Sequence, residues 1–236
     1  MEAGMLPTDT IAPATDDVSY FREVFAWMAV GLVVTGGVSA VIGHNQTAVH
    51  ALFDTTGGTW AVIIAIVIEL LLVAGLVTLV QHMTVFAAGT TFVAYAGLNG
   101  VTLSVIFAVY TTKSIFSAFL VAAAMFGLLA VWGYTTGADL TRFGSLLFMA
   151  LIGLLIGVTV NLFWLNSTLY WVTTIGGVLV FSGLTAFDVQ RLKRYEPPPG
   201  SDGTVVQKDA IVGALALYLD FVNLFLYLLR IFGRRR

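Results

Sequence analysis

Two carboxylic acids lie in long apolar stretches near the carboxyl-terminal end of this sequence. Asp188 ends one such stretch, and Asp220 lies in the middle of the next. An ionisable side chain at membrane depth is costly and usually functional. If the two carboxyl groups touch, they cannot both ionise cheaply, so one proton is shared between them. The pattern therefore predicts a proton-sensitive pair, and two carboxylates also suit transient binding of a hard divalent cation.

The helix that carries Asp220 is expected to have a single polar face. Spacings of three and four residues place on that face Gly213, Ala216, Asp220, Asn223, Tyr227 and Arg230. In lipid, such a face must turn toward protein or toward a water-filled cavity. We interpret it as the lining of a pathway. In the alternative interpretation, Asp220 and Asn223 only form hydrogen bonds to neighbouring helices.

Glu69 is a third acid inside an apolar segment. We expect it to form an ion pair with Arg230, because neither charge is tolerable alone in hydrocarbon. Zinc-protease, nucleophile-elbow and phosphate-loop motifs do not occur, so the sequence does not predict an enzyme. A tightly bound cofactor is not expected either.

The composition is that of a membrane protein. Of the 236 residues, 58% are hydrophobic and only 10% are charged, whereas a soluble domain has about 25% charged residues. The net charge of −2 does not indicate a basic surface that would bind nucleic acid. There is no cysteine, which excludes disulfides and thiolate metal sites. The lipid bilayer is therefore the first expected partner.

The apolar residues fall into seven segments that are each long enough to cross a bilayer. They are residues 24–42, 60–80, 86–110, 114–134, 144–165, 169–187 and 210–230. We therefore predict an all-α integral membrane protein with a seven-helix transmembrane domain over residues 20–233. A polar and disordered tail is expected over 1–19, and a basic end over 234–236. The pair Gly153 and Gly157 predicts a close helix contact.

The orientation depends on whether the last segment spans the membrane. With seven spans, six Lys and Arg residues lie on the amino-terminal side and five on the other, which decides nothing. A re-entrant last segment would make the split ten to one, but its length favours a span. In both arrangements the amino terminus and the linker over 191–209 share the cytoplasmic side.

Three stretches together resemble the Bax inhibitor-1 family of membrane proteins. The strongest is residues 214–226 (ALALYLDFVNLFL), followed by LRIFG at 229–233. The second is FDVQ at 187–190. The third combines Phe126-Gly127, Gly133-Tyr134, Thr136, Asp139-Leu140-Thr141 and Gly144. The resemblance extends over about residues 20–233.

The resemblance implies a bundle whose carboxyl-terminal helix is central. It also implies a leak of cations, chiefly Ca²⁺, controlled by a pH-sensitive aspartate pair that corresponds to Asp188 and Asp220. Ca²⁺ is then the permeant ion, and prokaryotic relatives lie in the plasma membrane. Relatives often carry a basic residue after the second segment that latches the pair. Here that turn reads Gln81-His82-Met83, so only a protonated His82 can replace it.

Two other functions are consistent with parts of the sequence. A non-transporting protein that binds another membrane protein, such as a membrane protease, would make use of the acidic amino-terminal tail. An intramembrane aspartyl protease also needs two membrane aspartates. Its usual Gly-x-Gly-Asp context is absent around both Asp188 and Asp220. A retinal protein is less favoured still, because residues 210–230 contain no Lys to form a Schiff base.

Overall fold

The chain is described by a computed structural model that covers residues 15–197 and 202–235, with side chains from residue 19 onward. Within these ranges the backbone is almost entirely helical, and its only β-bridge joins Tyr110 to Arg235. The elements are α1 Thr15–His44, α2 Gln46–Phe53, α3 Thr56–Leu79, η1 Val80–His82, α4 Val85–Leu103, α5 Ile106–Val109, α6 Thr112–Thr135, α7 Thr141–Phe163, α8 Ser167–Lys193 and α9 Gly203–Phe232.

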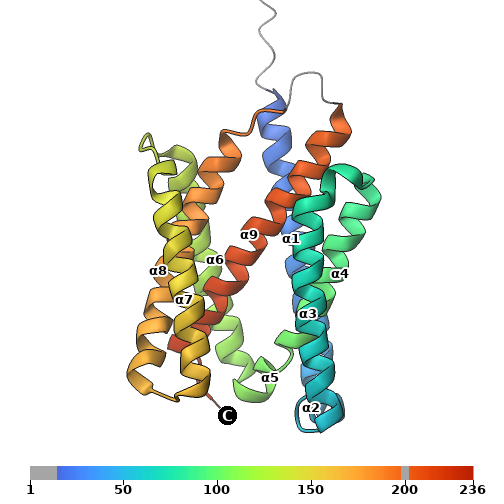
Figure 1. The fold of residues 1–236 in the computed structure, drawn as a ribbon, viewed down its shortest axis with the longest axis vertical. Coiled ribbons are helices and arrows are strands. Elements are labelled where there is room, and N and C mark those ends of the chain that lie inside the picture. Colours follow the sequence, from blue (N-terminus) through green and yellow to red (C-terminus); the bar gives the residue numbers. More distant parts are fainter. Residues whose placement is uncertain (1–14, 198–201, 236) are drawn as a thin grey trace, which may run out of the picture.

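Seven helical segments in the described ranges are long and apolar enough to span a membrane. They coincide with the seven predicted segments, and α2 is an additional short helix between the first two. The two ends of α9 lie at opposite ends of the bundle (Figure 1). The last segment therefore spans the bundle and is not re-entrant, and the all-α seven-span fold is confirmed.

The bundle consists of two groups of three helices that are joined by α9 (Figure 1). One group contains α1, α3 and α4, and the other contains α6, α7 and α8. Helix α9 crosses diagonally between them and packs against α1, α4, α6 and α8. In the most apolar 18 residues of α9, 72% of the residues are buried inside the protein, whereas in α7 the share is 6%. The prediction of a central carboxyl-terminal helix is therefore confirmed.

The two helices that carry the aspartates are longer than predicted. Helix α8 continues past residue 187 to Lys193, and α9 begins at Gly203 instead of residue 210. Asp202 caps α9 by accepting hydrogen bonds from the backbone amides of Thr204 and Val205, at 3.0 and 3.2 Å. The hydrogen bonds from Thr204 and Val205 lower the pKa of the Asp202 carboxyl. The apolar pattern underestimated both helices because their polar turns extend beyond the hydrocarbon.

Only one glycine of the predicted pair, Gly157, makes a close helix contact. Gly153 has no atom within 4 Å of a built Cβ position, so it forms no close contact. Gly157 does approach Thr173 of α8. Within the group of α6, α7 and α8, the tightest contact is at Gly133 of α6, where a Cβ would lie 2.4 Å from the carbonyl oxygen of Ala186. Helices α6 and α8 can approach this closely only because residue 133 has no side chain.

Most of the predicted amino-terminal tail lies outside the described residues. Helix α1 begins at Thr15, so the last residues of the range 1–19 are helical. At the other end, the backbone of Arg234 is fixed against the start of α6. Its carbonyl oxygen accepts a hydrogen bond from the amide of Thr111 at 3.1 Å, and its amide donates to Ser114 Oγ at 3.0 Å.

Candidate functional site

Asp188 and Asp220 meet where α9 crosses α8. Each carboxyl group is an electrostatic neighbour of the other. Asp220 is only 4% exposed, while the side chain of Asp188 is 15% exposed. The extra turns of α8 and α9 explain the contact, because Asp188 lies more than a turn before the end of α8. The two aspartates singled out in the sequence are therefore brought together.

The buried aspartate lacks a hydrogen-bond donor. Oδ2 of Asp220 is buried and has no hydrogen-bond partner among the described residues. An ionised carboxylate can only accept hydrogen bonds, whereas a protonated one can donate. Leaving a buried polar atom unpaired costs about 1–3 kcal/mol. The Asp220 carboxyl is therefore a buried group whose hydrogen bonding is incomplete.

Arg191 is the cation nearest to the pair. Its Nη1 lies 3.8 Å from Oδ1 of Asp188, one turn further along α8, and its side chain is 70% exposed. The sequence analysis did not connect these two residues, although a spacing of three in a helix was the signal that could have found the contact. The arginine makes the pair asymmetric, because it lies beside Asp188 only.

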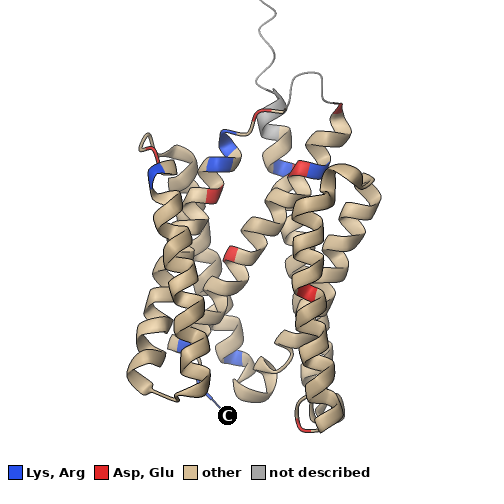
Figure 2. Ribbon diagram, viewed as in Figure 1, with Lys and Arg blue, Asp and Glu red and all other residues tan. Residues whose placement is uncertain are grey.

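A cavity of about 570 Å³ leads to Asp188. Its walls come from α1, α3, α8 and α9, and it includes residues of the segment after α8. Figure 2 shows that most charged residues lie toward the ends of the bundle and few at mid-depth. Charged side chains that line the cavity are Asp188, Arg191, Arg194, Glu196 and Asp209. The pair is therefore approached from the linker end of the molecule.

A hydrogen-bonded cluster lies at the side of this cavity. Asp209 accepts hydrogen bonds from the Tyr195 hydroxyl at 2.5 Å and from Gln81 Nε2 at 2.7 Å. The Tyr195 ring stacks on Tyr20 at 4.4 Å. Burial and the hydrogen bond to Asp209 raise the pKa of the Tyr195 hydroxyl, so it remains a donor at neutral pH. The cluster ties α9 to α1 and α3.

The turn after α3 does not supply the expected latch. His82 is exposed and does not line the cavity, so it does not reach the aspartate pair. The nearby position is taken by Lys208 of α9, which is buried and donates to the Gln81 carbonyl oxygen at 3.1 Å. A lysine there is favourable because a helix ends in unpaired carbonyl groups.

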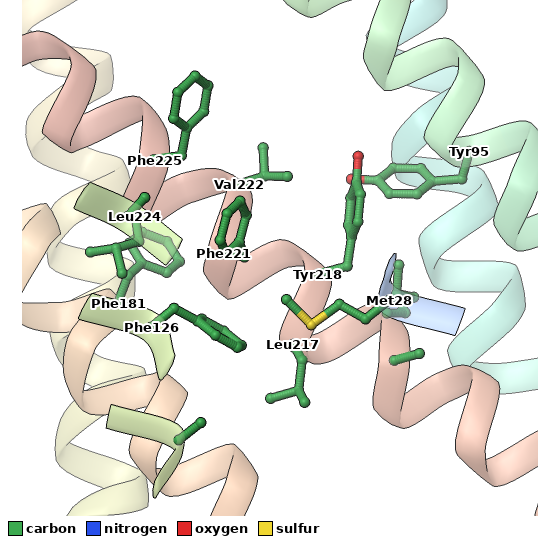
Figure 3. Packing of buried hydrophobic residues seen from close by; sticks show 14 of the residues in the cluster. Met28, Tyr95, Phe126, Phe181, Leu217, Tyr218, Phe221, Val222, Leu224 and Phe225 are labelled. Atoms are coloured by element: carbon green, nitrogen blue, oxygen red, sulfur yellow. The ribbon is translucent and has the colours of Figure 1, made fainter. Parts of the chain in front are cut away.

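Aromatic side chains close the bundle on the other side of Asp220. The ring of Phe221 lies 5.5 Å from Phe126 and 5.4 Å from Phe119, both edge-on. The rings of Phe181 and Tyr227 stack at 5.9 Å. Figure 3 shows Phe126, Phe181, Phe221 and Phe225 gathered around α9. The cavity therefore reaches Asp188, and these aromatic contacts pack α6 and α8 against α9.

The carboxyl-terminal part of the polar face of α9 makes contacts within the protein. Asn223 Nδ2 donates to the carbonyl oxygen of Leu219 in its own helix, at 2.8 Å. Tyr227 is buried against Phe181 and lies over Gly177, whose Cβ would be 2.5 Å from the ring. The stripe is thus turned toward protein, as expected, but Asn223 and Tyr227 do not line the cavity near Asp188.

The expected ion pair between Glu69 and Arg230 is not formed. The Glu69 carboxylate accepts hydrogen bonds from Asn99 Nδ2 at 3.3 Å and from Thr102 Oγ1 at 3.1 Å. Arg230 instead lies over the rings of Tyr227 and Tyr170, at 5.1 and 6.0 Å from their centroids. Helix α4 supplies donors to Glu69 from the same helix group, so this acid needs no distant cation.

The Glu69 cluster extends to the central helix. Asn99 Oδ1 accepts a hydrogen bond from the Tyr218 hydroxyl at 3.0 Å, and this hydroxyl is 2.6 Å from Thr35 Oγ1. Thr35 in turn donates to the carbonyl oxygen of Ala96 at 2.8 Å. This chain of contacts fastens α9 to the group of α1, α3 and α4. The sequence analysis missed Tyr218 because its position opposite the polar stripe made it look like an ordinary core residue.

Comparison with known proteins gives one consistent result. The family model described as "Inhibitor of apoptosis-promoting Bax1" matches residues 18–236. The inner membrane protein YbhL of Escherichia coli is 44% identical over 228 residues, 96% of both chains. The uncharacterised protein RP147 of Rickettsia prowazekii is 39% identical over 217 residues, 92% of this chain and 90% of its own.

Proposed function

We propose that this chain, which belongs to the Bax inhibitor-1 family, is a pH-sensitive, calcium-permeable leak channel gated by Asp188 and Asp220. The observation that carries the proposal is the buried Oδ2 of Asp220, which has no hydrogen-bond partner among the described residues and neighbours Asp188, a carboxyl group that lines an open cavity. The role is transport and not catalysis.

The gate would act through one proton. At low pH the pair is singly protonated, and the shared proton ties α8 to α9. Raising the pH removes that proton, and two carboxylates in a poorly solvated site repel each other. Separating the helices, or admitting a cation between the carboxylates, relieves this repulsion. Arg191 beside Asp188 would lower the cost of ionising that partner first.

Calcium suits the site by its chemistry. Ca²⁺ takes carboxylate, carbonyl and water oxygens in flexible geometry. Asp188 and Asp220 provide two carboxylates, and the cavity provides room for water. The acidic side chains of Glu196 and Asp209 lie along the approach.

The orientation follows from the linker. We place the amino terminus and the cavity mouth on the cytoplasmic side of a plasma membrane. The basic residues Arg191, Lys193 and Arg194 beside the mouth favour this side, as does the inner-membrane location stated in the name of the Escherichia coli relative. Protease accessibility of a tag after Arg236 in oriented vesicles tests this placement.

The test is Ca²⁺ flux into liposomes that contain the purified full chain, stepped in pH. Flux should rise with pH between about pH 6 and 8, and this dependence should disappear in both Asp188→Asn and Asp220→Asn. Glu69→Gln is the matched control, because it neutralises another membrane carboxyl that has donors, and it should retain the dependence.

Two outcomes would reject the proposal. If both aspartate variants fold and keep the wild-type pH dependence, the pair is not the gate. If the folded wild-type chain passes no cation at any pH, a non-transporting role that binds another membrane protein becomes the better explanation.

A further inference from the structure

A second, apolar groove lies between α1 and α6, away from the aspartate pair. Its volume is about 230 Å³. Helix α9 forms its floor through Phe221 and Phe225, and α5 closes one side through Phe107. The walls include Gly36 of α1 and Ile115 of α6. All of these residues belong to candidate membrane spans, so the medium outside the groove is the bilayer.

Two of the three hydroxyl groups that line this groove are already engaged. Thr35 Oγ1 donates to the Ala96 carbonyl oxygen at 2.8 Å, and Ser39 Oγ donates to the Gly36 carbonyl oxygen at 3.2 Å. Apart from the Thr112 hydroxyl at the start of α6, what remains toward the groove is hydrocarbon. A polar ligand would lose its hydration there without new hydrogen bonds, which costs several kcal/mol. The groove therefore suits an apolar chain.

The groove opens toward lipid. Phe116 at its edge is 62% exposed and Phe119 is 38% exposed, and both lie on α6. An empty groove would leave its lining without contact partners on one side, and this forfeits dispersion energy. An acyl chain of the bilayer can enter without crossing a polar surface. Hydrocarbon is thus the occupant that the surroundings supply.

The end of the groove near the start of α6 carries positive charge. Thr112 lines the groove and is followed by the exposed Lys113, one turn before Phe116. Arg234 is held beside the same turn by the backbone hydrogen bonds with Thr111 and Ser114. Neither Lys113 nor Arg234 forms an ion pair in the part of the chain that the structure describes. Two such cations at a membrane end favour an anionic headgroup.

We propose that the groove between α1 and α6 binds one anionic phospholipid, with an acyl chain against Phe221 and Phe225 and the phosphate beside Lys113 and Arg234. The site involves neither Asp188 nor Asp220. Binding can be measured without any flux, so its failure would leave the proposed channel function untouched, and the reverse also holds.

Two adjacent glycines offer a matched test of the apolar part. A Cβ at Gly36 or at Gly37 meets no atom within 4 Å, so both positions accept a larger side chain. Only Gly36 lines the groove. Gly36→Leu should fill the groove and weaken binding of phosphatidylglycerol about tenfold, while Gly37→Leu should bind like wild type. Native mass spectrometry of the full chain in detergent, titrated with this lipid, measures both.

The charged part is tested with the headgroup. Wild type should bind phosphatidylglycerol more tightly than phosphatidylcholine with the same acyl chains, and Lys113→Gln should reduce that preference several-fold. Arg142→Gln, which changes a basic residue at the start of α7, is the control and should keep it.

Two results would overturn the proposal. Equal lipid binding by Gly36→Leu and Gly37→Leu would show that the groove is not the site. Equal binding of the two lipids by wild type would show that the occupant is not selected by charge. If Gly36→Leu does not fold, the smaller Gly36→Val replaces it in the same comparison.

Discussion

Glu69 and Asp220 are both carboxylic acids buried at membrane depth, but their surroundings differ. Glu69 lies inside one helix group and accepts two hydrogen bonds from α4. Asp220 lies between the two groups, has a buried oxygen without a donor, and faces another carboxyl. The first acid has the environment of a structural residue. In the proposed gate, the second would depend on a proton for its hydrogen bond, as a switch requires.

Glu69 and Asp220 also differ in the helix group to which each connects the central helix α9. Tyr218, two residues before Asp220, joins α9 to the Glu69 cluster through Asn99 and Thr35. Asp220 joins α9 to α8 of the other group. Loss of the shared proton would therefore loosen α9 from α8 while the Glu69 cluster keeps it attached to α1, α3 and α4.

Replacement of each acid by leucine should have opposite consequences. Glu69→Leu leaves the Asn99 amide and the Thr102 hydroxyl without their acceptor, at a cost of about 1–3 kcal/mol per buried group. At about pH 8, where both carboxylates of the proposed gate are ionised, Asp220→Leu removes a repelling charge at similar volume, so it should be neutral or stabilising. Thermal unfolding in detergent measures both. The comparison fails if Asp220→Leu is as destabilising as Glu69→Leu.

If α9 loosens from α8 as a unit of the bundle, α6 and α8 must move together as one group. Gly133→Ala would place a methyl group 2.4 Å from the Ala186 carbonyl oxygen, so the two helices must separate. Such overpacking costs about 1–3 kcal/mol. Gly153→Ala in α7 meets nothing within 4 Å and is the matched control. A chemical-denaturation midpoint for Gly133→Ala equal to that of Gly153→Ala would contradict this close contact.

Loss of the Tyr218 hydroxyl should weaken the attachment of α9. Tyr218→Phe removes the contacts to Asn99 and Thr35, at a cost of about 1 kcal/mol. Because Glu69 and Tyr218 share Asn99, the costs of Tyr218→Phe and Glu69→Gln should not add in the double variant. A double-mutant cycle on the unfolding free energy tests the coupling. Simple additivity would mean that the two residues act independently.

The smallest effect is expected at an exposed carboxylate outside the membrane. Hydrogen bonds from the side chains of Thr141 and Arg194 lower the pKa of Asp139 to about 2. Since the folded-state pKa is depressed, this stabilisation is present above the ordinary value of 3.8 and is lost as the pH falls toward 2. Asp139→Asn should therefore lower the melting temperature slightly at neutral pH and not at about pH 2. An unchanged difference at both pH values would contradict the ionic origin.

Much of the fold could be predicted from the sequence because a bilayer imposes strict rules on a chain. Each span must be apolar, helical and about 20 residues long, so the seven segments and their order followed directly. A polar stripe in the last segment had to face protein, and the family resemblance added that this helix is central. The pairing of Asp188 with Asp220 followed from their motifs and from the shared end of their helices.

The partners of the other polar residues were decided by the tertiary structure alone. The sequence offered Arg230 as the cation for Glu69, but α4 lies closer and supplies neutral donors. It offered His82 as the latch, but Lys208 takes the end of α3 and Arg191 lies beside Asp188. Whether a segment spans the membrane depends on the free energy of transferring its residues from water to lipid, and the amino-acid composition determines this quantity. A hydrogen bond depends on the rotation and crossing of two helices, and these are set by close contacts such as Gly133 against Ala186.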